Sequence, residues 1–338
     1  MYDVMAIGNA LVDHEYQLND EQLIKTSLAK GTMTLASFDE QTQLLNEFKA
    51  QQIQPSKQSG GGSAANAMYA FSCLGGKSFY GCRVGDDEAG KFYLNDLNQA
   101  GVATSDQLSI THDGVTGSCV VAITPDGERT MQTYLGTSSD IQQANIDLDA
   151  LSQSDWLYFE GYLAMSEALR PDLQKIRKQA IDNNTKIAVS FADPAVVNFG
   201  KEGLVEMLGE GVDTIFCNVD EAKLFTDAKD IKQAAQVLTN YCQLAVVTSG
   251  PDDTVICQRD KDGARHLTIV SPPTVDNAID TNGAGDNYSG AFLYALTQGY
   301  SLQQCAQLAG HVASRIVQQF GPRLTSEQYQ QIAQQILG

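Results

Sequence analysis

The chain has 338 residues, enough for one large domain, or for a large domain with a small appendage, around a sizeable core. Its 22 Lys and Arg against 41 Asp and Glu give a formal charge of −19, which disfavours nucleic acid and anionic membranes as partners. Seven cysteines without a CxxC pair predict neither a disulfide framework nor a zinc site, so we expect reduced, mostly buried thiols.

The N-terminus enters a strand-like run directly, without the basic start and long apolar stretch of a signal peptide. No apolar run approaches the roughly 20 residues needed to cross a bilayer. We therefore expect a soluble, cytoplasmic protein.

Short apolar runs recur along the chain with helical patterns between them. They are Val4 to Ile7, Phe79 to Val84, Trp156 to Phe159, Ile187 to Phe191, Thr214 to Cys217 and Leu244 to Val247. This alternation predicts an α/β fold with a mostly parallel sheet covered by helices. Each run ends in small or polar residues, and such sheets bind ligands beyond the carboxyl ends of their strands, so we expect the site there.

Two stretches, about residues 14–38 and 110–135, interrupt this alternation and are predicted to be extended without a following helix. The second contains Pro125-Asp126-Gly127 between two strand-like runs, which is typical of a hairpin. We interpret both stretches as a small β-sheet lid inserted into a single domain of residues 1–338. A pair of edge strands on the main sheet is the alternative.

The strongest chemical signal is Asp280-Thr-Asn-Gly-Ala-Gly-Asp286, followed by an apolar helical pattern. The small residues Gly283, Ala284 and Gly285 would leave backbone N–H groups free at the start of the helix, which suits anionic oxygens. Asp286, at the same helix start, is placed to accept the proton of a substrate hydroxyl during phosphoryl transfer. A glycine turn with a capping aspartate is the structural alternative.

This segment resembles the DTxGAGD signature of the ribokinase (PfkB-type) family of carbohydrate kinases, and Gly61-Gly-Ser-Ala-Ala-Asn66 resembles the family's GGxxxN segment. The resemblance runs from Gly8 to about Arg323 and is strongest to bacterial members similar to adenosine kinase. It implies a ribokinase-like fold, a central mostly parallel sheet sandwiched by helices with a small β-sheet lid. It also implies ATP and Mg²⁺ as cofactors, and allows for a monovalent cation such as K⁺.

The resemblance assigns a group of residues to the acceptor: Asn9, Asp13, Gly61, Gly62, Asn66, Glu160 and Arg129. Asp13 ends Gly8-Asn-Ala-Leu-Val-Asp13, which is similar to the GNPLLD segment that binds ribose in adenosine kinases. A carboxylate can accept hydrogen bonds from two vicinal hydroxyls, which suits a ribose. A surface aspartate, a plain glycine turn and a solvated arginine are the structural alternatives for Asp13, Gly61-Gly62 and Arg129.

A second group is assigned by resemblance to the nucleotide: Asn218, Thr248, Gly250, Thr281, Gly283, Gly285 and Ser314. Asn218 and Glu221 match the family's NxxE segment, which helps to hold magnesium through water. Magnesium prefers oxygen ligands and keeps several waters, so one carboxylate with the ATP phosphates is sufficient. A helix N-cap with Glu three residues later is the structural alternative.

We therefore expect a kinase that transfers the γ-phosphate of ATP to a primary hydroxyl of an adenosine-like nucleoside, with Asp286 as catalytic base. Ribose or another free sugar is the alternative acceptor, and the resemblance leaves open a homodimer formed through the lid. A noncatalytic, ligand-binding regulatory relative is a second class, against which the retention of Asp286, Asn218 and Glu221 argues. A dinucleotide-dependent oxidoreductase is disfavoured because no GxGxxG follows the first strand.

Overall fold

The computed structural model describes all 338 residues and contains a nine-stranded sheet, a five-stranded sheet and a two-stranded sheet. The nine-stranded sheet has the order β16-β15-β14-β13-β12-β11-β1-β5-β7. Its strands are β1 (Tyr2–Ile7), β5 (Ser78–Gly81), β7 (Val102–Ala103), β11 (Ser154–Glu160), β12 (Lys186–Ser190), β13 (Val212–Asn218), β14 (Cys242–Ser249), β15 (Asp252–Arg259) and β16 (Arg265–Val270). Neighbours from β7 to β14 are parallel, whereas β15 and β16 pair antiparallel. The predicted α/β class and mostly parallel sheet are confirmed.

Helices cover both faces of this sheet, which explains why its central parallel strands are mostly apolar. In β1, Val4 and Ala6 belong to one buried cluster and Met5 and Ile7 to the other, because successive side chains of a strand point to opposite faces. The first face is covered by α3 (Ser63–Cys73), α4 (Glu88–Gln99), α11 (Ala284–Thr297), α12 (Leu302–Ile316) and α13 (Ser326–Leu337). The second is covered by α6 (Leu148–Ser152), α7 (Arg170–Asp182), α8 (Pro194–Leu208), α9 (Val219–Thr226) and α10 (Ile231–Leu238).

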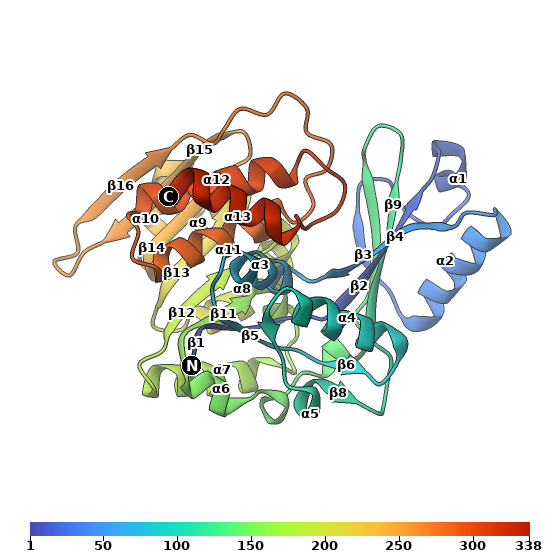
Figure 1. The fold of residues 1–338 in the computed structure, drawn as a ribbon, viewed down its shortest axis with the longest axis horizontal. Coiled ribbons are helices and arrows are strands. Elements are labelled where there is room, and N and C mark those ends of the chain that lie inside the picture. Colours follow the sequence, from blue (N-terminus) through green and yellow to red (C-terminus); the bar gives the residue numbers. More distant parts are fainter.

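The five-stranded sheet, called the second sheet below, stands apart from the helix-covered body (Figure 1). Its order is β3 (Met33–Leu35), β10 (Arg129–Tyr134), β9 (Gly117–Ile123), β2 (Leu11–Gln17) and β4 (Pro55–Gly61). The predicted hairpin is β9–β10, and it lies in this sheet, so the alternative of edge strands on the main sheet is wrong.

Two helices beside the second sheet and one of its strands depart from the sequence prediction. Helix α1 (Asp20–Ile24) interrupts the stretch expected to be extended, and α2 (Phe38–Ala50) follows it. Leu44 and Phe48 of α2 are buried against the sheet. Strand β4 was missed because its sequence, PSKQSGG, is polar and largely exposed and lacks the apolar alternation of a typical strand.

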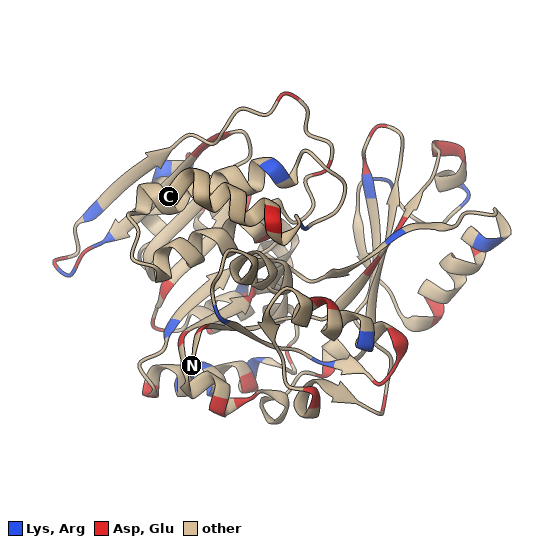
Figure 2. Cartoon of the chain, in the orientation of Figure 1, with Lys and Arg blue, Asp and Glu red and all other residues tan.

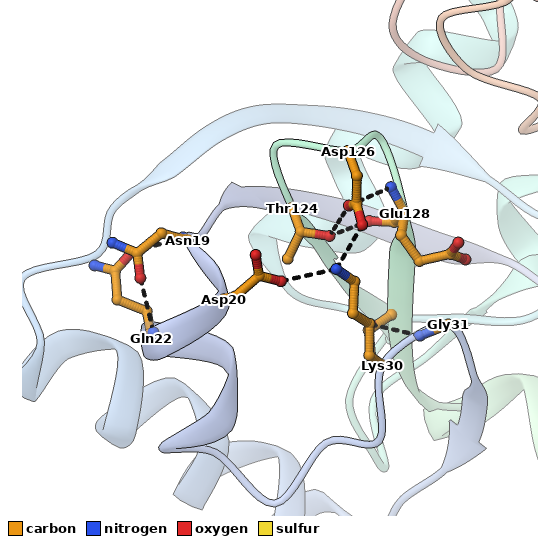
Figure 3. A network of polar contacts seen from close by, with 9 residues as sticks. Asn19, Asp20, Gln22, Lys30, Gly31, Thr124, Asp126 and Glu128 are labelled. Carbon is orange, nitrogen blue, oxygen red and sulfur yellow. Dashed lines mark hydrogen bonds and ion pairs between the residues drawn. The ribbon is translucent and has the colours of Figure 1, made fainter.

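A polar network ties the tip of the β9–β10 hairpin to α1 (Figure 3). Lys30 Nζ lies 2.7 Å from Asp20 Oδ1 and 2.6 Å from Asp126 Oδ2. Thr124 Oγ1 donates to Asp126 Oδ1 at 2.6 Å, which closes the turn. Because exposed ion pairs contribute little stability, the network orients the hairpin tip more than it stabilises the fold.

Among the places where the chain crosses between the body and the second sheet are Asn9 and Gly61-Gly62, called the two crossings below; the chain also crosses before β9 and after β10. Tyr80 Oη donates to the Asn9 carbonyl at 2.9 Å, and Tyr93 Oη donates to the Gly61 carbonyl at 3.1 Å. Gly62 has φ of +94°, and a Cβ there would lie 2.4 Å from the Asn9 carbonyl oxygen. The two crossings therefore lie against one another and require glycine at position 62.

The apolar run from Phe79 to Val84, predicted as one strand, is divided between two sheets. Strand β5 ends at Gly81, and β6 (Val84–Gly85) pairs with β8 (Ile110–Thr111) in the two-stranded sheet. Between them, Arg83 Nη1 donates to the Asp140 carbonyl at 2.7 Å. The remaining elements are α5 (Asp106–Ser109) and the short 3₁₀ turns η1 (Gly136–Asp140), η2 (Gln143–Asn145) and η3 (Gly161–Met165).

All seven cysteines are buried and unpaired, as predicted. Figure 2 shows Lys and Arg dispersed over many elements of the ribbon. None of the helices has the length and apolar character that crossing a membrane requires.

Candidate active site

The carboxyl ends of the parallel strands bring several predicted site residues to one edge of the main sheet. Asn9 follows β1, Glu160 ends β11, Asn218 ends β13 and Thr248 lies near the end of β14. Because these strands run parallel in adjacent positions, the residues share this edge. Helix α11, which packs against α3, adds Asp286.

The start of α11 has the features of an anion-binding site. Gly283 is the N-cap, with φ of +73°, and no side chain caps this end of the helix. A Cβ at Gly283 would lie 2.6 Å from Pro322 Cβ, so only glycine fits, whereas a Cβ at Gly285 would meet no atom within 4 Å. The first turn therefore faces open space with its backbone N–H groups lacking side-chain acceptors.

Asp286 lies in this first turn, with both carboxylate oxygens held by α3. Ser63 Oγ donates to Oδ1 at 2.6 Å, and Asn66 Nδ2 donates to Oδ2 at 3.0 Å. Burial raises the pKa of Asp286, and these two hydrogen bonds, with the charge of Arg323, oppose the rise. A half-buried, oriented carboxylate with a raised pKa is suited to accepting a proton.

Asp13 projects from β2 beside Gly61 of β4. It is 9% exposed, so the alternative of a surface aspartate is wrong. A Cβ at position 61 would lie 2.4 Å from Asp13 Oδ1, which explains the glycine there. Burial raises the pKa of Asp13 to about 7, with the charge of Arg323 as the main opposing influence.

Glu160 and Asn9 contact each other at the first crossing. Asn9 donates to Glu160 Oε1 from its backbone N at 3.2 Å and from Nδ2 at 2.7 Å, while Ala64 N donates to Oε2 at 2.9 Å. Burial raises the pKa of Glu160 to about 7. Both oxygens of this carboxylate therefore have protein partners, and the contacts fix the start of α3 against the crossing.

Arg129 joins the second sheet to the body. Its Nη2 pairs with Asp280 Oδ2 and lies 4.0 Å from Glu15 Oε1. The Asp280 carboxylate also accepts from the backbone N of Asn282 at 2.9 Å and of Gly321 at 2.8 Å. The Arg129 side chain is 11% exposed, so the alternative of a solvated arginine is wrong.

Asn218 and Glu221 form a reciprocal cap at the start of α9. Asn218 Oδ1 accepts from the backbone N of Glu221 at 2.9 Å, and Asn218 Nδ2 donates to Glu221 Oε1 at 2.7 Å. The structural alternative is thus present in the fold, and it does not conflict with a role towards a cation. Burial raises the pKa of Glu221 to about 7, and the negative charges of Asp193 and Asp286 add to the shift.

These carboxylates fit magnesium held through water. No three His, Cys, Asp or Glu side chains are close enough to form a metal site by themselves. The negative charges of Asp193 and Asp286 nevertheless act on the Glu221 carboxylate, which a cation would relieve. Mg²⁺ prefers oxygen ligands, keeps several waters and binds together with nucleotide phosphates.

The other predicted nucleotide residues have few strong contacts with the protein. Thr248 Oγ1 donates to the Cys217 carbonyl at 3.5 Å, and Ser314 Oγ donates to the Pro273 carbonyl at 3.4 Å. Gly250 has φ of +55° in the turn from β14 to β15. Thr281 accepts from the Ala284 N–H at 3.3 Å, directly before α11.

Ser63 and Arg323 also belong to the site, although neither was predicted from the sequence. Ser63 follows the glycine pair and begins α3, so its position beside Gly61-Gly62 was a usable signal. Arg323 Nε donates to Asn66 Oδ1 at 2.9 Å from a position 257 residues away. No local pattern indicates such a contact.

Comparisons with known proteins agree with this architecture. The family described as "pfkB family carbohydrate kinase" matches residues 31–328. The adenosine kinase of Saccharomyces cerevisiae is 29% identical, with 96% of this chain and 97% of that protein aligned. The crystal structure of adenosine kinase from Sinorhizobium meliloti has a TM-score of 0.87 at 31% identity, with 99% of each chain covered. A probable sugar kinase from Rhizobium etli also has a TM-score of 0.87, at 29% identity over 99% of this chain and 98% of its own. The chain therefore belongs to the pfkB family of carbohydrate kinases, has their ribokinase-like fold and is a kinase.

Proposed function

We propose that the protein transfers the γ-phosphoryl group of ATP to a primary hydroxyl of a nucleoside, and that adenosine is the acceptor. The observation that carries the proposal is the half-buried Asp286 carboxylate, which lies in the first turn of α11 beside an uncapped helix start and is held by Ser63 and Asn66. Similarity to proteins named adenosine kinase, along almost the whole chain, supports the choice of acceptor.

In the proposed reaction, Asp13 and Asn66 hold the acceptor, and Asp286 takes the proton from its attacking hydroxyl. The hydroxyl oxygen forms a bond to the γ-phosphorus as the bond from that phosphorus to ADP breaks, and ADP leaves. Ser63 and Asn66 orient the carboxylate that receives the proton. Asp13 is suited to a diol because its carboxylate can accept a hydrogen bond from each of two vicinal hydroxyls. It lies mostly buried on β2, beside Gly61 of the second crossing.

The backbone from Asn282 to Gly285 is proposed to stabilise the negative charge of the transferring group. Arg129, whose Nη1 is buried without a partner, retains a free donor for substrate or phosphate. Glu221 and Asn218 would hold magnesium through water. When bound with ATP, magnesium neutralises phosphate charge.

The second sheet is proposed to act as a lid on a single domain of residues 1–338. It is built from the two inserted stretches predicted from sequence together with β4. Its contacts with the body at the two crossings and through Arg129 support this role. Closure over the acceptor would exclude water from the reacting phosphate.

The experiment that tests the acceptor is a phosphorylation assay with purified protein, ATP and magnesium over adenosine, other nucleosides, ribose and hexoses. We expect adenosine 5′-monophosphate as product and a kcat/KM for adenosine at least ~10²-fold above that for ribose, because a site that binds the nucleobase gains differential contacts. A higher kcat/KM for ribose would replace the nucleoside by the free sugar. No phosphorylation of any acceptor would favour a noncatalytic relative.

Three finer points belong to the same proposal. Dependence on a monovalent cation such as K⁺ rests on the family resemblance alone and is tested by replacing K⁺ with Cs⁺ or Na⁺ in the assay. A homodimer through the lid is supported by the exposed Leu35 and Phe38 at its β3 side and is tested by light scattering. A cytoplasmic location is supported by the seven unpaired cysteines and is tested by cell fractionation.

A further inference from the structure

Arg323 lies on the loop after α12 and contacts the site through Asn66, which lies between it and Asp286 in a chain of hydrogen bonds. Its Nε donates to Asn66 Oδ1 at 2.9 Å, while Asn66 Nδ2 donates to Asp286 Oδ2 at 3.0 Å. An arginine side chain only donates hydrogen bonds, so the amide oxygen of Asn66 must face Arg323. The amide NH₂ of Asn66 is thereby directed at Asp286.

The guanidinium of Arg323 is itself fixed on two other sides. Nη1 pairs with Asp96 Oδ2 of α4, and the guanidinium carbon lies 4.5 Å above the ring centre of Tyr69 of α3. The Arg323 side chain is 8% exposed. Strand β4 covers the pair, since a Cβ at Gly60 would lie 2.7 Å from Asp96 Oδ2 and 2.8 Å from Arg323 Nη1.

The positive charge of Arg323 acts on both acceptor-side aspartates. It opposes the burial that raises the pKa of Asp286 and that of Asp13. Nη2 of Arg323 is buried without a hydrogen-bond partner, and only Nη1 pairs with Asp96. Asp96 therefore leaves one of the buried guanidinium nitrogens of Arg323 without an acceptor. The titratable groups that influence or are influenced by Asp286 from the surrounding elements are Asp13, Tyr158, Glu160, Tyr162, Glu221 and Arg323. Arg323 is the cation among them.

We propose that Arg323 is a positioning residue for phosphoryl transfer, which fixes the Asn66 amide so that it donates to Asp286 and favours the charged form of that base. The inference rests on the proposed function, in which Asp286 takes the proton. A flipped amide would instead turn its oxygen to Asp286, where it can accept a hydrogen bond only from the protonated acid and so favours the inactive form. The competing view is that Arg323 only fastens the loop after α12 to α4 through Asp96.

The test compares Arg323→Met with Asp96→Asn, because both changes break the same ion pair but only the first removes the donor to Asn66. Initial rates are measured with adenosine and ATP from about pH 5.5 to about pH 9, alongside thermal unfolding. For Arg323→Met we expect kcat to fall ~10- to 100-fold, with the KM for ATP within ~2-fold of wild type. The acidic limb of its pH profile should move to higher pH, because a carboxylate that loses a neighbouring cation binds its proton more tightly.

Asp96→Asn should lower the melting temperature while its kcat stays within ~3-fold of wild type and its acidic limb does not move to higher pH. Arg177→Met is the control for loss of a half-buried arginine elsewhere: Arg177 donates to the carbonyls of Leu208 and Gly211, at the amino-terminal side of β13. It should leave the pH profile unchanged. Equal losses of kcat in Arg323→Met and Asp96→Asn, with unmoved pH profiles, would overturn the positioning role.

Arg323→Lys keeps the inference testable if Arg323→Met does not fold. Lysine retains the charge but lacks a planar Nε donor, so we expect a reduced kcat with the acidic limb close to that of wild type. A wild-type kcat in a folded Arg323→Lys protein would overturn the geometric part of the inference. Asp286→Asn is measured in the same series: if it stays active, the proposed function fails, and if it is inactive while every Arg323 variant behaves as wild type, only the role of Arg323 fails.

Discussion

Replacing Asp286 by asparagine changes the proposed base with little change of shape. The new amide fits the existing hydrogen bonds. Asn66, oriented by Arg323, continues to donate to the oxygen of residue 286, and the hydroxyl of Ser63 can turn to accept from the new NH₂. The substitution therefore removes the negative charge and the ability to take a proton without leaving a buried group unpaired.

We expect Asp286→Asn to lower kcat by at least ~10², the usual contribution of a positioned general base, while the KM for adenosine changes little. Stability should not fall. Burial raises the pKa of Asp286, so the ionised carboxylate opposes folding at neutral pH, and a neutral amide removes this penalty. We therefore expect the Asp286→Asn protein to be at least as stable as wild type.

The assay is steady-state kinetics with adenosine and ATP, with circular dichroism as a control for folding and calorimetric titration of ADP as a control for nucleotide binding. A near wild-type kcat in a folded Asp286→Asn protein would refute the assignment of the base. A large rise in the KM for adenosine without a fall in kcat would show that Asp286 binds the acceptor and does not move its proton.

Three further predictions concern other parts of the site. Glu221→Gln should raise the magnesium concentration needed for half-maximal rate, because a buried carboxylate near Asp193 and Asp286 loses its charge; an unchanged requirement would favour a pure capping role. Asp13→Ala should chiefly raise the KM for adenosine and leave the KM for ATP unchanged, and an unaltered KM for adenosine would remove Asp13 from the acceptor site. Amide hydrogen exchange over residues 117–134 should slow when adenosine binds, and equal protection without ligand would mean that the second sheet is fixed and does not close.

The predictability of the fold follows from how each strand is buried. Strands such as β11 and β13 are covered on both faces and therefore carry continuous apolar runs that the sequence displays. Strand β4 lies at an edge of the second sheet and is largely exposed, so nothing in its composition distinguishes it from a loop. Strands β15 and β16, the antiparallel pair at one end of the main sheet, were also not predicted, although β15 has a buried centre and β16 contains β-branched residues.

The site divides in the same way between local and long-range signals. The helix start at Gly283 and the base at Asp286 are contiguous in sequence, so their residue types and spacing carry the prediction. The partners of Glu160 and Arg323 come from 96 to 257 positions away. Their side-chain chemistry alone leaves open whether they contact substrate or protein, and only the fold supplies the partner.

The buried carboxylates of the site also bear on how stability depends on pH. Burial raises the pKa of Asp13, Glu160 and Glu221 to about 7 in the folded protein. In the unfolded chain these groups titrate near ~4, so between the two values the folded state binds more protons than the unfolded state. Their contribution to stability is complete below the unfolded pKa and is lost as the pH rises through about 7. Burial lowers the pKa of His14, so this side chain reduces the stability of the fold as the pH falls below ~6.5. His14 is a single group, whereas three carboxylates change stability in the opposite direction.

We therefore predict that the melting temperature of the ligand-free protein rises as the pH is lowered from about 8 to about 5.5, while kinase activity falls in the same range because Asp286 must be ionised. Thermal unfolding followed by circular dichroism at constant ionic strength measures the first trend, and initial rates measure the second. Asp13→Asn is the matched variant, because it removes one of the three titrating groups at a buried position and should flatten the rise in melting temperature. A melting temperature that stays constant or falls over this range would show that the carboxylates are paired or hydrated well enough to remain ionised without cost. Opposite slopes for stability and activity would instead show that the carboxylates of the site stay ionised for catalysis at the expense of folding stability.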